Sequence, residues 1–173
     1  MAENLLKREF HAKAPNEKWL TDVTEFKYGQ DQKAYLSAIL DIHGNNLISY
    51  VLGHSNNNKL VFETLDQALG AVPGATPMLH SDRGFQYTSL AFKKRLDKAN
   101  ITQSMSRVGR CIDNGPMEAF WGTLKCEMYY LQTYSTFEEL KRDIEAYIHF
   151  YNNERLQAKL NDLSPVEFRA KAA

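Results

Sequence analysis

Cysteine is scarce in this sequence, and the two cysteines present, Cys111 and Cys126, form no CxxC pair. No two histidines stand at the spacing of metal ligands, so neither a disulfide framework nor a zinc site is indicated. The start of the chain lacks the apolar core of a signal peptide, and no apolar run approaches the roughly 20 residues that span a bilayer. We therefore expect a soluble protein of a reducing cytosol.

Net charge is absent as well. The 21 Lys and Arg residues balance 21 Asp and Glu residues, so no overall field identifies a partner. Local charge is uneven, because the stretch from Arg83 to Arg110 holds seven basic residues and one acidic residue, Asp97. This block is either a surface for nucleic acid or the solvated face of a helix, and the sequence leaves both interpretations open.

Internal repeats and low-complexity segments are also missing, and 173 residues with 43% hydrophobic content fit one globular domain. Residues 1–18 are polar and contain Pro15, which predicts an N-terminal arm or linker. The domain itself is expected over residues 19–173.

Hydrophobic alternation predicts an α/β fold. Residues 19–28, 34–42 and 47–53 alternate with the period of strands and are joined by short turns, which indicates an antiparallel meander. A helix capped within residues 56–58 follows, then a short strand over 77–81, a helix after Thr88 or Ser89, and a strand over 101–106. This order describes a five-stranded mixed sheet with helices packed on it.

The remaining third of the chain predicts a loop and then helices. Residues 107–115 are rich in glycine and poor in apolar side chains, and we expect a mobile loop there. Pro116 suits the first position of a helix whose apolar stripe runs to Leu131. On that helix Glu118 and Lys125 project within about 20° of each other, with Gly122 between them leaving room for a phosphate. Further helices are expected from Thr136 and from Ser164.

Three carboxylates are candidate metal ligands: Asp22, Asp82 and Glu118. Asp22 shares a strand face with Leu20 and Phe26, where an unpaired charge is costly to bury. Asp82 follows a strand, and ligands in such folds gather at the carboxyl ends of the strands. Each acid also has an ordinary interpretation, with Asp82 as a turn residue and Glu118 as a first-turn helix acid.

Carboxylates that converge repel one another unless a cation compensates their charge. Oxygen ligands without Cys or His suit Mg²⁺ or Mn²⁺, and two such ions would support in-line phosphoryl transfer on a nucleic acid. Asp22 would bridge both ions, while Asp82 and Glu118 would hold one each. Two rival acids are interpreted otherwise: Asp41 as a strand-end residue and Asp113 as a loop or helix-cap residue.

Two further residues have open roles. His80 either helps to position a ligand or fills a strand position, and we favour the strand position. Lys125 contacts either a DNA phosphate or solvent, and its shared face with Glu118 favours the phosphate.

Several ordered motifs carry a family resemblance: WLTDVT (19–24), HSDRGFQYTS (80–89), SMSRVG (104–109), DNGPMEAFWGTLK (113–125), YNNER (151–155) and LSP (163–165). Together they closely resemble the integrase-type catalytic core of OrfB-type bacterial insertion-sequence transposases, relatives of retroviral integrase. The resemblance implies an RNase H-like fold, a catalytic DDE triad at Asp22, Asp82 and Glu118, and a basic DNA-binding residue at Lys125. Gln157 departs from the family, which usually has histidine there.

The resemblance also implies an activity and partners. It implies two Mg²⁺ or Mn²⁺ ions per site, cleavage of DNA at transposon ends and transfer of the freed 3′-hydroxyl to a target strand. DNA contacts are expected from Arg83, Arg107 and Arg110, and relatives act as homodimers or higher multimers in the bacterial cytoplasm. Full-length relatives have an upstream helix-turn-helix region, which we expect this chain to lack.

Two alternatives stay open. One is an RNase H-like nuclease that stops at hydrolysis, and the other is a catalytically silent DNA-binding or assembly fragment. In each case the neutral net charge predicts weak, salt-sensitive DNA binding.

Overall fold

The computed structural model describes residues 1–172, and for Cys111 and Ile112 it describes the backbone only. A five-stranded sheet in the order β3-β2-β1-β4-β5 forms the centre of the molecule. Its strands are β1 (Lys18–Tyr28), β2 (Gln32–Asp41), β3 (Asn46–Gly53), β4 (Met78–Ser81) and β5 (Thr102–Met105). The first three pair antiparallel, and β4 and β5 continue the sheet parallel to β1. The predicted α/β fold with a mixed sheet is confirmed.

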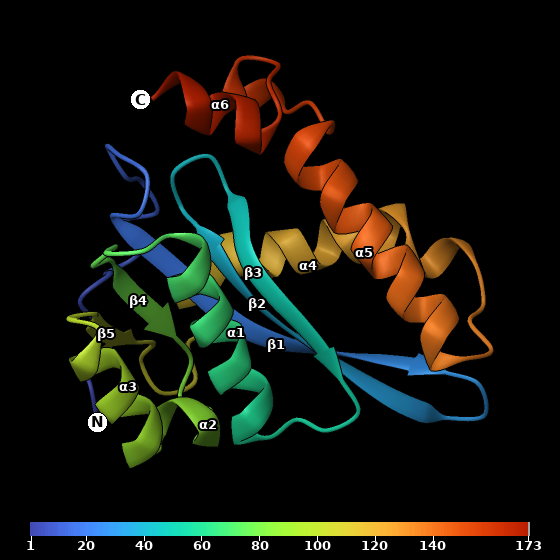
Figure 1. Ribbon diagram of the computed structural model, residues 1–173, viewed down its shortest axis with the longest axis horizontal. Coiled ribbons are helices and arrows are strands. Elements are labelled where there is room, and N and C mark those ends of the chain that lie inside the picture. The colour runs from blue at the N-terminus through green and yellow to red at the C-terminus, as the bar shows by residue number, and fades with distance from the viewer. Residues whose placement is uncertain (173) are drawn as a thin grey trace.

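Helices cover both faces of the sheet (Figure 1). One face carries α1 (Asn58–Ala71) and α3 (Leu90–Lys98), which pack with Trp19, Ile39 and Leu79. The other face carries α4 (Gly115–Glu127) and α5 (Phe137–Asn153), which pack with Leu20 and Phe26. Since alternate residues of a strand face opposite sides, Asp22 lies on the α4 side with Leu20 and Phe26, as predicted.

Side-chain caps begin most of the helices where the sequence predicts them. Asn57 caps α1, Ser89 caps α3 and Thr136 caps α5, in each case by accepting a backbone N–H two or three positions into the helix. Ser164 forms a capping box with Glu167 at the start of α6 (Pro165–Lys171). A short helix, α2 (Phe85–Thr88), was not predicted.

The predicted stripe of α4 is too long at its C-terminal end. The helix ends at Glu127, and Tyr129–Leu131 form a separate 3₁₀ turn, η2, in which Leu131 is 73% exposed. The Tyr129 side chain accounts for the break. Its ring packs edge-on against Phe26 at 4.9 Å between centroids, and its hydroxyl bonds to the backbone of Lys27.

Within the N-terminal segment, residues 3–6 pack against β5, and residues 12–16 contact the end of β2 and the turn that follows it. The backbone N–H groups of Leu5 and Leu6 donate to Ser104 Oγ at 2.9 and 3.1 Å, and Leu6 is only 1% exposed. Arg8 pairs with the buried Asp113. The N-terminal segment therefore contributes to the core, and the division into an arm (1–18) and a core (19–173) stays a prediction.

Candidate active site

Three segments that are distant in sequence bring Asp22, Asp82 and Glu118 to one cavity of about 390 Å³. Asp22 lies in β1, Asp82 directly follows β4, and Glu118 lies in the first turn of α4. The parallel pairing of β1 with β4 brings the first two together, and α4 packs on the Asp22 face of the sheet. The other lining residues are Arg83, Ser106, Arg107, Val108, Gly109, Arg110 and Asn114.

Asp22 has the most perturbed carboxyl group in this cavity. Burial, with smaller contributions from the charges of Asp82 and Glu118, raises its pKa from 3.8 to about 7. Hydrogen bonds from the Val23 backbone and from Trp121 Nε1, which lies 3.1 Å from Asp22 Oδ2, oppose the rise. Near neutral pH the carboxyl group is therefore poised between its two forms, and a bound cation would favour the ionised form.

Asp82 is held in a tight turn at the carboxyl end of β4. Its Oδ1 accepts the backbone N–H of Gly84 at 2.7 Å, and its side chain is exposed. A Cβ at position 84 would lie 2.9 Å from the same Oδ1, so a larger residue there would displace the Asp82 carboxylate. Asp82 therefore acts as a turn residue, as expected. Its other carboxylate oxygen takes no part in this hydrogen bond.

Glu118 is exposed in the first turn of α4, and Lys125 lies two turns further along the same helix. The Lys125 ammonium donates to Thr24 Oγ1 at 2.9 Å and lies 5.2 Å from the centroid of the Phe26 ring. Burial lowers the pKa of Lys125, although nearby carboxylates oppose the change. A Cβ added at Gly122 would have no neighbouring atom within 4 Å, so the helix does leave the expected space at this position. A DNA contact by Lys125 stays a prediction.

The residues of this cavity fit a hard divalent cation in type. The donors are carboxylate oxygens, and two of the three carboxylates are exposed, which leaves room for water or phosphate oxygens. Among the described residues no three His, Cys, Asp or Glu side chains are already grouped closely enough to hold a metal ion. Side-chain movement of Asp82 and Glu118 would therefore accompany binding by all three.

Basic residues form part of the cavity wall, and two of them have protein partners. Arg83 Nε donates to the backbone oxygen of Ser106 at 2.7 Å. Arg107 donates through Nε and one terminal nitrogen to the two carboxylate oxygens of Asp113, at 3.1 and 2.9 Å. Arg110 is exposed at the same wall. The predicted DNA contacts of these three arginines remain predictions.

The rival acids have structural partners. Asp41 ends β2, is fully buried and pairs with Arg169, which confirms its interpretation as a strand-end residue. Asp113 is also fully buried, within the 3₁₀ turn η1 (Cys111–Asn114), and it accepts bonds from Asn4, Arg8 and Arg107. The Arg107 guanidinium is the main cause that holds the Asp113 pKa well below its usual range.

His80 fills a strand position, as favoured. It is 1% exposed, and its Nδ1 and Nε2 lie 2.8 and 3.1 Å from Ser104 Oγ and Ser106 Oγ. Burial lowers the His80 pKa to about 4. The neutral ring therefore links β4 to β5 beneath the cavity.

Sequence reasoning missed three residues that support the site. Trp121 was assigned to an apolar stripe, yet its indole N–H bonds to Asp22. Tyr87 is buried, with its hydroxyl unpartnered among the described residues and its pKa raised well above its usual value by burial and by the charge of Asp22. Asn114 is 3% exposed at the cavity wall. Only Trp121, one helical turn from Glu118, carried a usable signal.

The five-stranded mixed sheet in the order β3-β2-β1-β4-β5, with helices on both faces, is an RNase H-like fold. Two family models, each described as Integrase core domain, match residues 12–111 and 118–172. The chain is 47% identical over 172 residues to an uncharacterized transposase-like protein of Haemophilus influenzae, which covers 99% of this chain and 79% of that protein. The chain belongs to the integrase core domain family and is a catalytic core of the insertion-sequence transposase type.

Another relative and two solved structures extend the comparison. A putative transposase InsK for insertion sequence element IS150 of Escherichia coli K12 is 45% identical over 169 residues, which cover 97% of this chain and 59% of the relative. The HTLV-2 integrase catalytic core domain in complex with magnesium (trimeric form) superposes with a TM-score of 0.73 at 17% identity, covering 92% of this chain and 99% of that one.

A simian T-cell lymphotropic virus intasome in complex with PP2A regulatory subunit B56 gamma superposes with a TM-score of 0.78 at 17% identity. This match covers 92% of the present chain and 56% of the viral chain. These likenesses identify the fold.

Among the described residues no helix is long and apolar enough to cross a membrane.

Proposed function

We propose that this chain catalyses metal-dependent phosphoryl transfer on DNA, cleaving transposon ends and joining the freed 3′-hydroxyl to a target strand. The observation that carries the proposal is the shared cavity of Asp22, Asp82 and Glu118, in which burial and the two neighbouring charges raise the Asp22 pKa to about 7. Such a perturbed acid in a cavity is typical of a functional site.

The three carboxylates would hold two Mg²⁺ or Mn²⁺ ions, which would polarise the attacking oxygen and the phosphodiester. The donor types support this assignment, and one solved neighbour of the same fold is described as a complex with magnesium. Trp121 would orient Asp22 through its hydrogen bond, and the turn at Gly84 would orient Asp82. The Trp121 contact holds Asp22 before any cation arrives, which reduces the ordering cost of binding for that ligand.

The chemistry requires no covalent enzyme intermediate. In cleavage, a water molecule loses a proton as its oxygen bonds to phosphorus, the bond from phosphorus to the 3′ oxygen breaks, and the released 3′ oxygen takes up a proton. In joining, the new 3′-hydroxyl attacks a target phosphodiester, loses its proton and releases a target 3′-hydroxyl. Arg83, Arg107 and Arg110 would lie beside the DNA backbone at the basic wall of the cavity.

The partners of the whole protein belong to the same proposal, because this chain spans 59% of the length of its Escherichia coli relative. DNA is the proposed substrate, and a homodimer or higher multimer is the proposed working form. The neighbours described as a trimeric and a dimeric HTLV-2 core support multimer formation by this fold.

The test uses Mn²⁺ and a branched DNA that mimics the product of strand transfer. Wild type is expected to reseal this DNA, Asp82→Asn is expected to fail, and the exposed Asp97→Asn, on α3, serves as the matched control. Metal-dependent hydrolysis without resealing would favour the nuclease alternative. If Asp82→Asn keeps both resealing and hydrolysis, the assignment of the site is contradicted. If wild type shows neither reaction, the silent-fragment alternative is favoured.

A further inference from the structure

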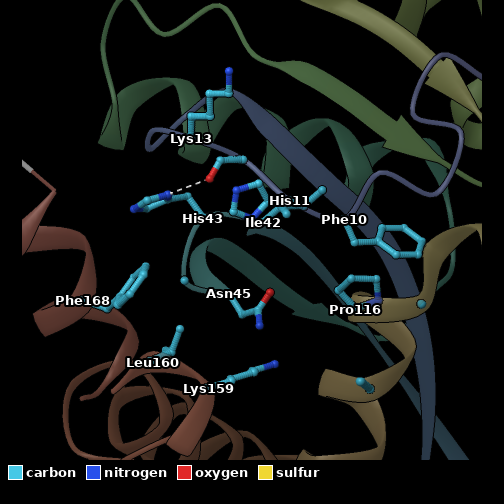
Figure 2. Close-up of a pocket in the computed structure, with 14 residues that line it drawn as sticks. Phe10, His11, Lys13, Ile42, His43, Asn45, Pro116, Lys159, Leu160 and Phe168 are labelled. Atoms are coloured by element: carbon cyan, nitrogen blue, oxygen red, sulfur yellow. Dashed lines mark hydrogen bonds between the residues drawn. The ribbon is translucent and has the colours of Figure 1, made fainter. Parts of the chain in front are cut away.

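A second cavity, larger than the candidate active site, lies on the other side of the first turn of α4. Its volume is about 610 Å³. Four segments form it: the N-terminal segment, the turn between β2 and β3, the start of α4, and the C-terminal segment around the 3₁₀ turn η3 (Ala158–Leu160) and α6 (Figure 2). None of the three candidate catalytic carboxylates lines it.

The charge in this second cavity has one sign. Lys13, Lys159, His11 and His43 line it, and no Asp or Glu residue does. Neither lysine ammonium forms an ion pair with a side chain in the part of the chain that the structure describes. In a chain with no net charge, a concavity lined by unneutralised cations favours an anionic ligand.

Lys159 is the cation placed to meet a ligand inside the cavity. Its side chain extends from the C-terminal segment toward the side that Pro116 lines, while Lys13 lies at the opposite rim (Figure 2). Partial burial and the charge of Arg155 lower the Lys159 pKa. Lys159 is nevertheless exposed, so a phosphate that enters the cavity can reach its ammonium group.

The remaining surface of the second cavity is aromatic and apolar. Phe10 and Phe168 lie on opposite sides of it (Figure 2). The Phe168 ring is 5.2 Å from the His43 ring, whose Nδ1 lies 3.2 Å from the backbone oxygen of Ala12. His43 Nε2 is buried without a partner among the described residues. Aromatic faces beside cations are the combination that binds the bases and phosphates of single-stranded nucleic acid.

The first turn of α4 connects this second cavity to the candidate active site. Gly115, Pro116 and Ala119 face the second cavity, whereas Asn114 and Glu118 face the active site. The two cavities lie on different faces of the same helical turn, so the width of a helix, about 10 Å with its side chains, separates them. A few nucleotides of one DNA strand would span this width.

We propose that the second cavity holds a nucleotide of the DNA strand whose neighbouring phosphodiester occupies the active site. Its phosphate pairs with Lys159, its base lies against the aromatic side chains, and Lys13 at the opposite rim adds to the positive field. This inference rests on the proposed function, since it requires DNA as the substrate. It adds a strand-positioning subsite built from the N-terminal and C-terminal segments.

The first test compares two double variants that remove the same charge. Lys13→Gln/Lys159→Gln alters the second cavity, and Lys59→Gln/Lys141→Gln is the control, because these lysines pair with Glu63 and Glu145 on other helix surfaces. Binding of the branched DNA is measured by fluorescence anisotropy with Ca²⁺ over a range of salt concentrations. We expect about a tenfold loss of affinity and a salt dependence shallower by about one to two for the cavity variant only.

The second test locates the nucleotide. Phosphates near the cleaved one are replaced singly by uncharged methylphosphonate, and the loss of affinity is measured for wild type and for Lys159→Gln. We expect one position at which the loss is large in wild type and absent in the variant, as coupling between two contacting groups requires. Ala119→Trp, which fills the cavity without changing charge, is expected to weaken binding, whereas Ala146→Trp on α5 is not.

The outcomes separate this inference from the proposed function. Suppose that wild type binds and reseals the DNA, that both double variants bind it with the same affinity as each other, and that no methylphosphonate position depends on Lys159. The subsite is then overturned and the proposed function stands. If wild type neither binds nor reseals the DNA, both are overturned.

Discussion

Acidifying the metal-free protein from pH 7 to pH 4.5 titrates two buried groups whose pKa values are shifted in opposite directions. Burial raises the pKa of Asp22 from 3.8 to about 7 and lowers the pKa of His80 from 6.5 to about 4. Both groups therefore take up protons over the same range of pH, Asp22 in the folded protein and His80 mainly in the unfolded chain. We predict that their effects on the free energy of unfolding nearly cancel.

The sign of each effect follows from proton linkage. Asp22 binds a proton more tightly in the folded state, so its contribution to stability is complete below pH 3.8 and is lost as the pH rises through about 7. His80 binds a proton more weakly in the folded state, so its contribution is complete above pH 6.5 and is lost as the pH falls through about 4. Between pH 4.5 and 6.5 the two slopes oppose each other.

The magnitudes follow from the size of the pKa shifts. At 1.36 kcal/mol per pKa unit, the full effect is about 4 kcal/mol for Asp22 and about 3 kcal/mol for His80. Asp22 keeps some contact with solvent, so its figure is an upper value. Asp113, whose pKa is depressed, titrates at lower pH and does not interfere in this range.

The assay is urea denaturation followed by circular dichroism at several pH values in the presence of EDTA. Wild type is expected to show little change between pH 4.5 and 6.5. Asp22→Asn removes one slope, so its stability should fall by up to about 1.4 kcal/mol per pH unit on acidification. His149→Gln, which alters an exposed histidine on α5, should follow wild type. A parallel profile for wild type and Asp22→Asn would refute the argument.

Two further predictions concern residues that support the site. Asp113→Ala removes a buried carboxylate bonded to Asn4, Arg8 and Arg107, and should lower the free energy of unfolding in urea by about 2–3 kcal/mol. The control Asp97→Ala, at an exposed ion pair, should lower it by at most about 0.5 kcal/mol. Equal losses in the two variants would contradict this prediction. Trp121→Phe removes the indole donor and should raise the Asp22 pKa further, as measured by carboxyl ¹³C NMR; an unchanged or lower pKa would show that the bond does not favour the ionised form.

Local patterns in the sequence were sufficient for most of the secondary structure. Period-two alternation located β1, β2 and β3, because one face of each strand packs against a helix. Cap candidates within residues 56–58, at Thr88 or Ser89, and at Ser164 located helix starts, because a side-chain acceptor must satisfy backbone N–H groups there. The end of α4 was misplaced, because the Tyr129 contact with Phe26 depends on a strand roughly a hundred residues earlier.

The candidate site likewise has features that nearby residues predicted and features that only the tertiary structure decided. The sequence alone determined that Asp22, Asp82 and Glu118 stand at a strand, a strand end and a helix start, since each position follows from nearby residues. The tertiary structure alone decided that Trp121 donates to Asp22 and that Asp113 is buried between two arginines. It also decided that the N-terminal and C-terminal segments line a cationic cavity beside α4. Those contacts join segments far apart in the chain, and local periodicity carries no information about which distant segments will meet.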